Sequence, residues 1–226
     1  MHKRSNESLM FGSIMTDEWV LPRVATTNDP LRLAIFFSGS GSGMAALLDH
    51  QKNRTCSHQT VVAVTDKSDA DGIVKAEQRG IPVEIIPLPT EHSPKENRKL
   101  HENYIQDAIE KYQIETIILS GYMRILTDNF VKKWRGRLLN IHPSLLPNYP
   151  GAHAHRDALA DGAKESGCTV HFVDTEVDAG PIIGQEKLPV YVDDDIESLS
   201  NRVKKAEHIL YPAVIDALAS GKITID

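Results

Sequence analysis

Short apolar runs alternate along the chain with segments whose apolar residues recur every three or four positions. We predict buried strands at 33–37, 61–65, 83–87, 117–119 and 138–141. Helices are expected at 44–50 and 72–79, and a longer one has an apolar face formed by Leu100, Tyr104, Ile105, Ala108, Ile109 and Tyr112. Strands that alternate with helices are typical of a parallel sheet with helices on both faces.

The pattern changes after about residue 150. Segments 169–173 and 182–185 are strand-like, and no helical segment separates them, which predicts antiparallel pairing. A long final helix is expected over 196–219, where Pro212 should cause a kink or a short break. The predicted fold class is therefore α/β, a Rossmann-like, mostly parallel sheet with helices on both faces and an antiparallel C-terminal edge.

Residues 1–30 show no clear period and mix polar side chains with a few apolar ones. We interpret them as a mobile N-terminal extension, followed by one domain over 31–226. The alternative is that Trp19, Val20 and Leu21 pack on the domain or on a partner, because tryptophan is usually well buried.

Composition and charge narrow the class of protein. The 226 residues are 41% hydrophobic and 25% charged, which is ordinary for a soluble globular chain. A net charge of -6 argues against a nucleic-acid partner, and no apolar run approaches the roughly 20 residues that span a membrane. Cys56 and Cys168 lack metal-type spacing, and no apolar segment follows the basic start. Reduced thiols, no signal peptide and a cytoplasmic location are expected.

A glycine-rich loop, Ser-Gly-Ser-Gly-Ser-Gly at 38–43, joins the first predicted strand to the first helix. Small residues let the backbone approach a ligand, and the free amides of a helix N-terminus favour phosphate. The loop lacks the Lys-Ser/Thr ending of nucleotide hydrolases, and Met44 stands where a dinucleotide fingerprint has its third glycine. The alternative is a tight turn without a ligand.

Asn140 and His142 end the fifth predicted strand and point to the same face. Ligands bind beyond the carboxyl ends of such strands, where an amide and an imidazole can stabilise an oxyanion and move a proton. A carboxylate paired with His142 would favour its charged form, and the candidates are Asp174, Glu176 and Asp178.

Further histidines follow at 153, 155 and 171, but none has a metal-site spacing. We therefore expect no metal.

Several segments together resemble the folate-dependent formyltransferases. They read Ser-Gly-Ser-Gly-Ser at 38–42, Gly-Tyr-Met-Arg-Ile-Leu at 121–126, Leu-Asn-Ile-His-Pro-Ser-Leu-Leu-Pro at 139–147 and Asp-Ala-Gly-Pro-Ile at 178–182, with further similarity at 149–156 and 207–212. The resemblance covers nearly all of 31–226, which it identifies as a formyltransferase domain.

The resemblance implies transfer of the formyl group of 10-formyltetrahydrofolate, as co-substrate, to the amine of glycinamide ribonucleotide in de novo purine biosynthesis. It selects Asp178 among the three acids and assigns catalysis to Asn140, His142 and Asp178. Asn140 and a protonated His142 would stabilise the oxyanion, and Asp178 would keep His142 charged. The expected partners are small-molecule substrates alone, with the chain a monomer or a homodimer.

The remaining expected contacts come from the same resemblance. Phosphate and ribose would contact Gly41, Ser42, Gly43 and Glu207, and the amine side would be lined by Gly121 and Met123. Folate would contact Arg124, Ile125, Leu126, Val173, Asp174 and Val177, and His171 would support the site from behind.

One residue departs from the family pattern, because the family usually has asparagine where Gly43 stands. Two alternatives stay open. The first is another folate-dependent formyl enzyme, a deformylase or a formyltransferase acting on a different amine. The second is a non-catalytic phosphate-binding module, which would leave Asn140, His142 and Asp178 without a joint role.

Overall fold

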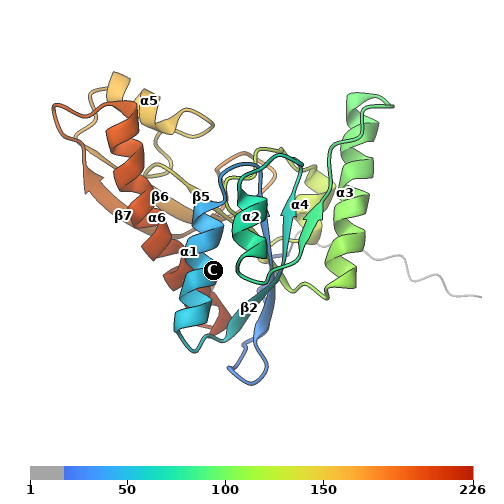
Figure 1. Cartoon of the computed structure of the whole chain (residues 1–226). Coiled ribbons are helices and arrows are strands. Elements are labelled where there is room, and N and C mark those ends of the chain that lie inside the picture. The colour runs from blue at the N-terminus through green and yellow to red at the C-terminus, as the bar shows by residue number, and fades with distance from the viewer. Residues whose placement is uncertain (1–17, 226) are drawn as a thin grey trace, which may run out of the picture.

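A seven-stranded sheet forms the centre of the computed structural model, which describes residues 18–225 (Figure 1). The strands lie in the order β3-β2-β1-β4-β5-β6-β7. Their bounds are β1 Leu31–Phe37, β2 His58–Thr65, β3 Val83–Ile85, β4 Thr116–Leu119, β5 Leu138–His142, β6 Glu165–Phe172 and β7 Ile182–Pro189. β1 to β5 pair in parallel, whereas β6 and β7 are antiparallel, so the predicted mixed sheet is confirmed.

Helices cover both faces of the sheet. They are α1 Ser42–Asn53, α2 Gly72–Glu77, α3 Pro94–Lys111, α4 Asp128–Lys133, α5 Ala154–Ala160 and α6 Ile196–Ala219. One apolar core joins the sheet to α1, α2 and α6, and a second joins it to α3 and α4. β1 contributes Leu33 and Ile35 to the first core and Ala34 and Phe36 to the second. A strand buried on both faces reads as a continuous apolar run, which is why the sequence predicted β1 well.

The differences from the sequence prediction have local causes. α4 and α5, with six and seven residues, were not predicted. α6 has the predicted bounds, but Pro212 lies inside one continuous helix, so the expected short break was wrong. Next to that proline, Tyr211 lies with its hydroxyl 3.0 Å from the carbonyl oxygens of both Leu119 and Leu139. This buried contact ties α6 to β4 and β5.

The segment before β1 packs on the domain. The rings of Trp19 and Phe172 lie 5.8 Å apart between centroids, and the backbone amide of Ala25 donates to the carbonyl of Ala219 at 2.8 Å. This part of the expected mobile extension is therefore held by contacts, as the alternative proposed for Trp19. Residues 1–17 lie outside the described residues.

Among the described helices, none has the length and apolarity that crossing a lipid bilayer requires.

Candidate active site

The glycine loop follows β1 and leads directly into α1. Gly41 is the residue before the helix and adopts a left-handed conformation with φ 62°. A Cβ there would lie 2.8 Å from the Cα of Gly72, so the backbone conformation and the packing both require glycine. Gly41, Ser42 and Gly43 therefore stand together at the N-terminus of a twelve-residue helix, where free amides favour an anion.

A lysine lies against this loop that sequence reasoning missed. The ammonium group of Lys75, on α2, donates to the carbonyl of Ser40 at 2.6 Å. A half-buried cation beside the helix N-terminus adds charge attraction for a phosphate. Lys75 could not be found from spacing alone, because the parallel pairing of β1 with β2 brings α2 to the loop.

Gly43 lies against Ser120, which directly follows β4. A Cβ at position 43 would stand 2.5 Å from the Ser120 hydroxyl oxygen. The space in which the asparagine expected from the resemblance would begin is therefore occupied by a serine side chain. Ser120 is half-buried, and its hydroxyl makes no side-chain hydrogen bond with the described residues.

The 121–126 segment is fastened to β1 and β2 by one buried acid. The Ser38 hydroxyl donates to Asp66 at 2.6 Å and accepts from the backbone amide of Met123 at 2.8 Å. Arg124 donates to the second oxygen of Asp66 at 2.7 Å. Burial acts to raise the pKa of Asp66, but the hydrogen bonds from Ser38 and Arg124 keep that pKa below its usual value. Ser38 and Asp66 therefore position the segment, and sequence reasoning missed both roles.

Three of the apolar side chains expected at the folate site are exposed to solvent. Met123 is 70% exposed, Ile125 65% and Val177 57%. Leu126 and Val173 are half-buried and pack against the core beneath them. Exposed apolar groups that flank a polar site are typical of a surface that receives an apolar ring.

Asp174, also expected at the folate site, forms an ion pair with Arg135. Burial acts to raise the pKa of Asp174, whereas Arg135 and the backbone amide of Thr175 keep it below its usual value. The Arg135 guanidinium also lies 5.1 Å from the centre of the Trp19 ring. Asp174 is thus engaged in a structural contact and is not the partner of His142.

Asn140 and His171 are directly opposite each other on the antiparallel strands β5 and β6. The Asn140 amide nitrogen lies 3.2 Å from His171 Nε2, and His171 Nδ1 lies 2.9 Å from the carbonyl oxygen of Phe172. Burial lowers the pKa of His171, which favours a neutral ring with its hydrogen on Nδ1. Nε2 then accepts from Asn140 and fixes which way that amide faces.

His142 is 4% exposed, and both of its ring nitrogens face acceptors. Nε2 lies 2.9 Å from the carbonyl oxygen of Tyr149, and Nδ1 lies 3.3 Å from Asp178 Oδ2. Only a ring with hydrogens on both nitrogens can donate to both oxygens. The geometry therefore suits a charged His142 beside an ionised Asp178.

Asp178 is held by His142 and by the loop at Gly151, and it lies near His171. Its Oδ2 also accepts from the backbone amide of Gly151 at 2.8 Å, and its Oδ1 lies 3.7 Å from His171 Nε2. The residue has φ 56°, a conformation that aspartate tolerates better than most residues. Gly180 permits the tight return of this segment, because a Cβ there would lie 1.8 Å from the carbonyl oxygen of Phe172.

The structure therefore brings the three expected catalytic residues to the carboxyl end of β5. Asn140 offers an amide, His142 a proton and Asp178 a countercharge, all at this end of the strand. Developing negative charge on a substrate oxygen is stabilised by such donors.

Glu207 lies on α6, and burial raises its pKa to about 7. Among residues 18–225 no hydrogen bond connects this carboxyl to the glycine loop. A carboxyl group that is partly desolvated and has no donor gains most from a ligand that brings hydroxyl donors.

The chain matches the model of the formyl transferase family over residues 31–215. It belongs to that family, and its class is that of enzymes that transfer a one-carbon formyl group. Phosphoribosylglycinamide formyltransferase of Escherichia coli is 38% identical over 193 residues, which cover 85% of this chain and 89% of that protein. The crystal structure of phosphoribosylglycinamide formyltransferase from Brucella melitensis has a TM-score of 0.79 and 40% identity, and covers 88% of this chain and 100% of that one.

Similarity extends to a larger protein. The trifunctional purine biosynthetic protein adenosine-3 of Gallus gallus is 43% identical over 195 residues, or 86% of this chain. The chain spans 19% of the length of that protein. The family and fold expected from the sequence are therefore confirmed, with the likeness extending along nearly the whole described domain.

Proposed function

We propose that this chain transfers a formyl group from 10-formyltetrahydrofolate to the amine of phosphoribosylglycinamide, a step of purine biosynthesis. The observation that carries the proposal is the convergence of Asn140, His142 and Asp178 at one strand end, next to a helix N-terminus suited to phosphate. A phosphate-binding module without catalysis would need only the second of these features.

Asn140 stabilises the oxygen of the transferred group. One amide hydrogen is directed to His171, and the second has no partner among the described residues. The side chain is half-buried, so this second hydrogen can reach a substrate oxygen. A donor fixed before reaction stabilises charge that develops on that oxygen without a cost of reorganisation.

His142 supplies positive charge and a proton at the same place. In this structure its Nε2 is directed to the Tyr149 carbonyl, and Tyr149 is held at φ 54°. Donation from Nε2 to a substrate therefore requires the Tyr149 carbonyl to move away. We infer that the loop over 143–151 shifts when the substrates bind, which exchanges one acceptor of His142 for another. Asp178 then keeps the ring charged and stays paired with its Nδ1 nitrogen.

The phosphate of the acceptor substrate binds at Gly41, Ser42 and Gly43, with Lys75 adding charge at the loop. Glu207 accepts from its ribose hydroxyls, and Gly121 and Met123 line the amine side. Holding both reactants in place converts a bimolecular encounter into a step within one complex.

The residues at 121–126 and 173–177 fit a flat, partly apolar formyl donor. Exposed Met123, Ile125 and Val177 offer apolar contact, and the backbone of the segment is fixed through Asp66. 10-Formyltetrahydrofolate supplies the activated one-carbon group. The same proposal predicts a cytoplasmic location and small-molecule partners. It predicts that the chain is a monomer or a homodimer.

The test is an absorbance assay of tetrahydrofolate formation with phosphoribosylglycinamide as acceptor. We expect turnover that depends on this amine and saturates with it. Product formed at the same rate without any amine would instead show hydrolysis, and turnover with another amine alone would show a different acceptor. Either result would contradict the proposal.

A further inference from the structure

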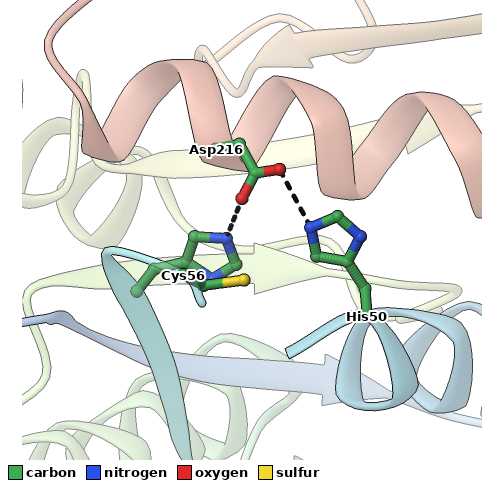
Figure 2. A group of neighbouring side chains, drawn as sticks. His50, Cys56 and Asp216 are labelled. Carbon is green, nitrogen blue, oxygen red and sulfur yellow. Dashed lines mark hydrogen bonds and ion pairs between the residues drawn. The ribbon is translucent and has the colours of Figure 1, made fainter. Parts of the chain in front are cut away.

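A second cluster of reactive side chains lies at the opposite end of the parallel strands from the active site. His50 near the end of α1, Cys56 in the following loop, His58 at the start of β2 and Asp216 on α6 converge there. Figure 2 shows Asp216 extending from α6 toward His50 and Cys56. One ligand atom from each residue lies within 4.8 Å of all the others.

The contacts within the cluster centre on the carboxylate. His50 Nε2 lies 2.9 Å from Asp216 Oδ2, and His58 Nε2 lies 2.8 Å from Asp216 Oδ1. The two imidazole rings are stacked, with an angle of 4° between their planes. The Nε2 atoms of His50 and His58 can therefore both be directed at a single ion that lies between the rings and Asp216.

The spacing suits a small, tetrahedral ion. Bonds of about 2.0–2.3 Å to nitrogen, oxygen and sulfur place tetrahedral ligand atoms roughly 3.3–3.8 Å apart. The two histidine–aspartate distances, 2.9 and 2.8 Å, lie below that range, and the other separations extend up to 4.8 Å. Side-chain movements of about 1 Å would therefore complete the coordination. Thiolate and imidazole ligands favour zinc, whereas calcium and magnesium prefer oxygen ligands alone.

We propose that His50, Cys56, His58 and Asp216 bind one Zn²⁺ ion as a closed, structural site that ties α1, β2 and α6 together. The sequence predicted no metal, because the usual metal spacings are absent around Cys56. Three ligands lie within 50–58, but the fourth comes from α6, more than 150 residues away in the chain. Folding alone brings it to the others.

The proton balance is simple. Cys56 loses its thiol hydrogen to solvent when its sulfur bonds to zinc, and each histidine binds through Nε2 while its hydrogen resides on Nδ1. His58 Nδ1 lies 2.8 Å from the side-chain nitrogen of Gln51. Rotation of the Gln51 amide would present its oxygen to that hydrogen and orient the ring, as outer partners of zinc ligands commonly do, in exchange for the bond that this oxygen accepts from the Thr60 amide.

The site is expected to serve stability and not formyl transfer. Parallel strands place His58 at the amino end of β2, whereas Asn140 and His142 lie at the carboxyl end of β5. An ion that binds the folded chain and links distant segments raises the temperature of unfolding.

The experiment uses the full chain after treatment with a chelator. Co²⁺ is titrated as a spectroscopic probe and then displaced with Zn²⁺, and the melting temperature is measured with and without zinc. We expect one Co²⁺ per chain, a thiolate-to-cobalt charge-transfer band and the strong visible bands of tetrahedral cobalt. Zinc at a hundredfold excess over its Kd should raise the melting temperature by roughly 5–10 °C.

Matched variants separate the site from adventitious binding. Cys56→Ser should abolish the charge-transfer band, and Asp216→Asn should weaken cobalt binding and remove most of the thermal gain. Cys168→Ala is the control, because Cys168 is fully buried on β6 and should leave the band unchanged. Chelator-treated enzyme should retain its formyl transfer.

Two results would overturn the proposal. One is the absence of saturable cobalt binding to the wild-type chain. The other is a band or a thermal gain that persists undiminished in both Cys56→Ser and Asp216→Asn. Activity does not enter either criterion, so the zinc site and the proposed reaction fail independently.

Discussion

Asn140 and His171 face each other across β5 and β6, and the amide nitrogen of the first lies 3.2 Å from Nε2 of the second. The carbonyl of Phe172 holds the other ring nitrogen at 2.9 Å, so the ring cannot turn without losing a buried hydrogen bond. We therefore propose that His171 is a positioning residue, which fixes the amide of Asn140 toward the substrate.

Replacement of His171 by leucine should release the Asn140 amide. We expect kcat to fall about tenfold, as for the loss of roughly one hydrogen bond, with KM for both substrates nearly unchanged. Glutamine at this position offers an oxygen acceptor and should recover part of kcat. Steady-state kinetics would show this split, and an equal loss of kcat in both variants would argue for a merely structural histidine.

Asp178→Asn should remove the countercharge of His142 while preserving the volume of the side chain. The asparagine oxygen can still accept from the Gly151 amide, so the loop stays anchored. We expect kcat to fall on the order of 10²–10⁴-fold. Asp174→Asn is the control, since Asp174 pairs with Arg135, and its effect should be on folate KM. A larger kcat loss in the control than in Asp178→Asn would contradict the assignment.

Gly43→Asn should restore the family residue but meet Ser120, whose hydroxyl oxygen would lie 2.5 Å from the new Cβ. The single variant should therefore bind the phosphate-bearing substrate less well than wild type. Gly43→Asn combined with Ser120→Ala removes the collision and should bind it more tightly than the single variant. KM for the acceptor substrate measures both, and identical KM values in the two variants would show that the contact is irrelevant.

Glu207 predicts a specific pH dependence of stability. Burial raises its pKa from the usual value of 4.5 to about 7, so between these values the folded chain binds a proton that the unfolded chain lacks. The stability from this group is fully present below about pH 4.5 and is lost as the pH rises through about 7. Chemical denaturation of wild type and Glu207→Gln across this range should show a difference that changes in that direction. A constant difference would refute the shift.

Much of the fold could be predicted because burial on both sheet faces leaves a continuous apolar pattern, as in Leu33 to Phe37 of β1. The three residues proposed for catalysis were harder to predict from the sequence. Strand alternation placed Asn140 and His142 on one face, but Asp178 was chosen only by resemblance, since Asp174 and Glu176 have similar sequence surroundings.

Contacts between distant segments left no signal in the sequence. Asp66 holds Ser38 and Arg124 together, and Trp19 packs on Phe172, yet neither pair has a characteristic spacing. The contact of Lys75 with the glycine loop was missed for the same reason. Such residues become visible only when parallel pairing sets which strand ends are neighbours.

The central claim is that His142 acts in the chemical step. The most direct measurement compares turnover and folate binding in His142→Ala, with His92→Ala as a control histidine that is exposed and lies before α3. The account predicts that turnover falls on the order of 10²–10⁴-fold in His142→Ala while the Kd for a folate ligand changes little, and that His92→Ala resembles wild type. Wild-type turnover in a folded His142→Ala enzyme would contradict it.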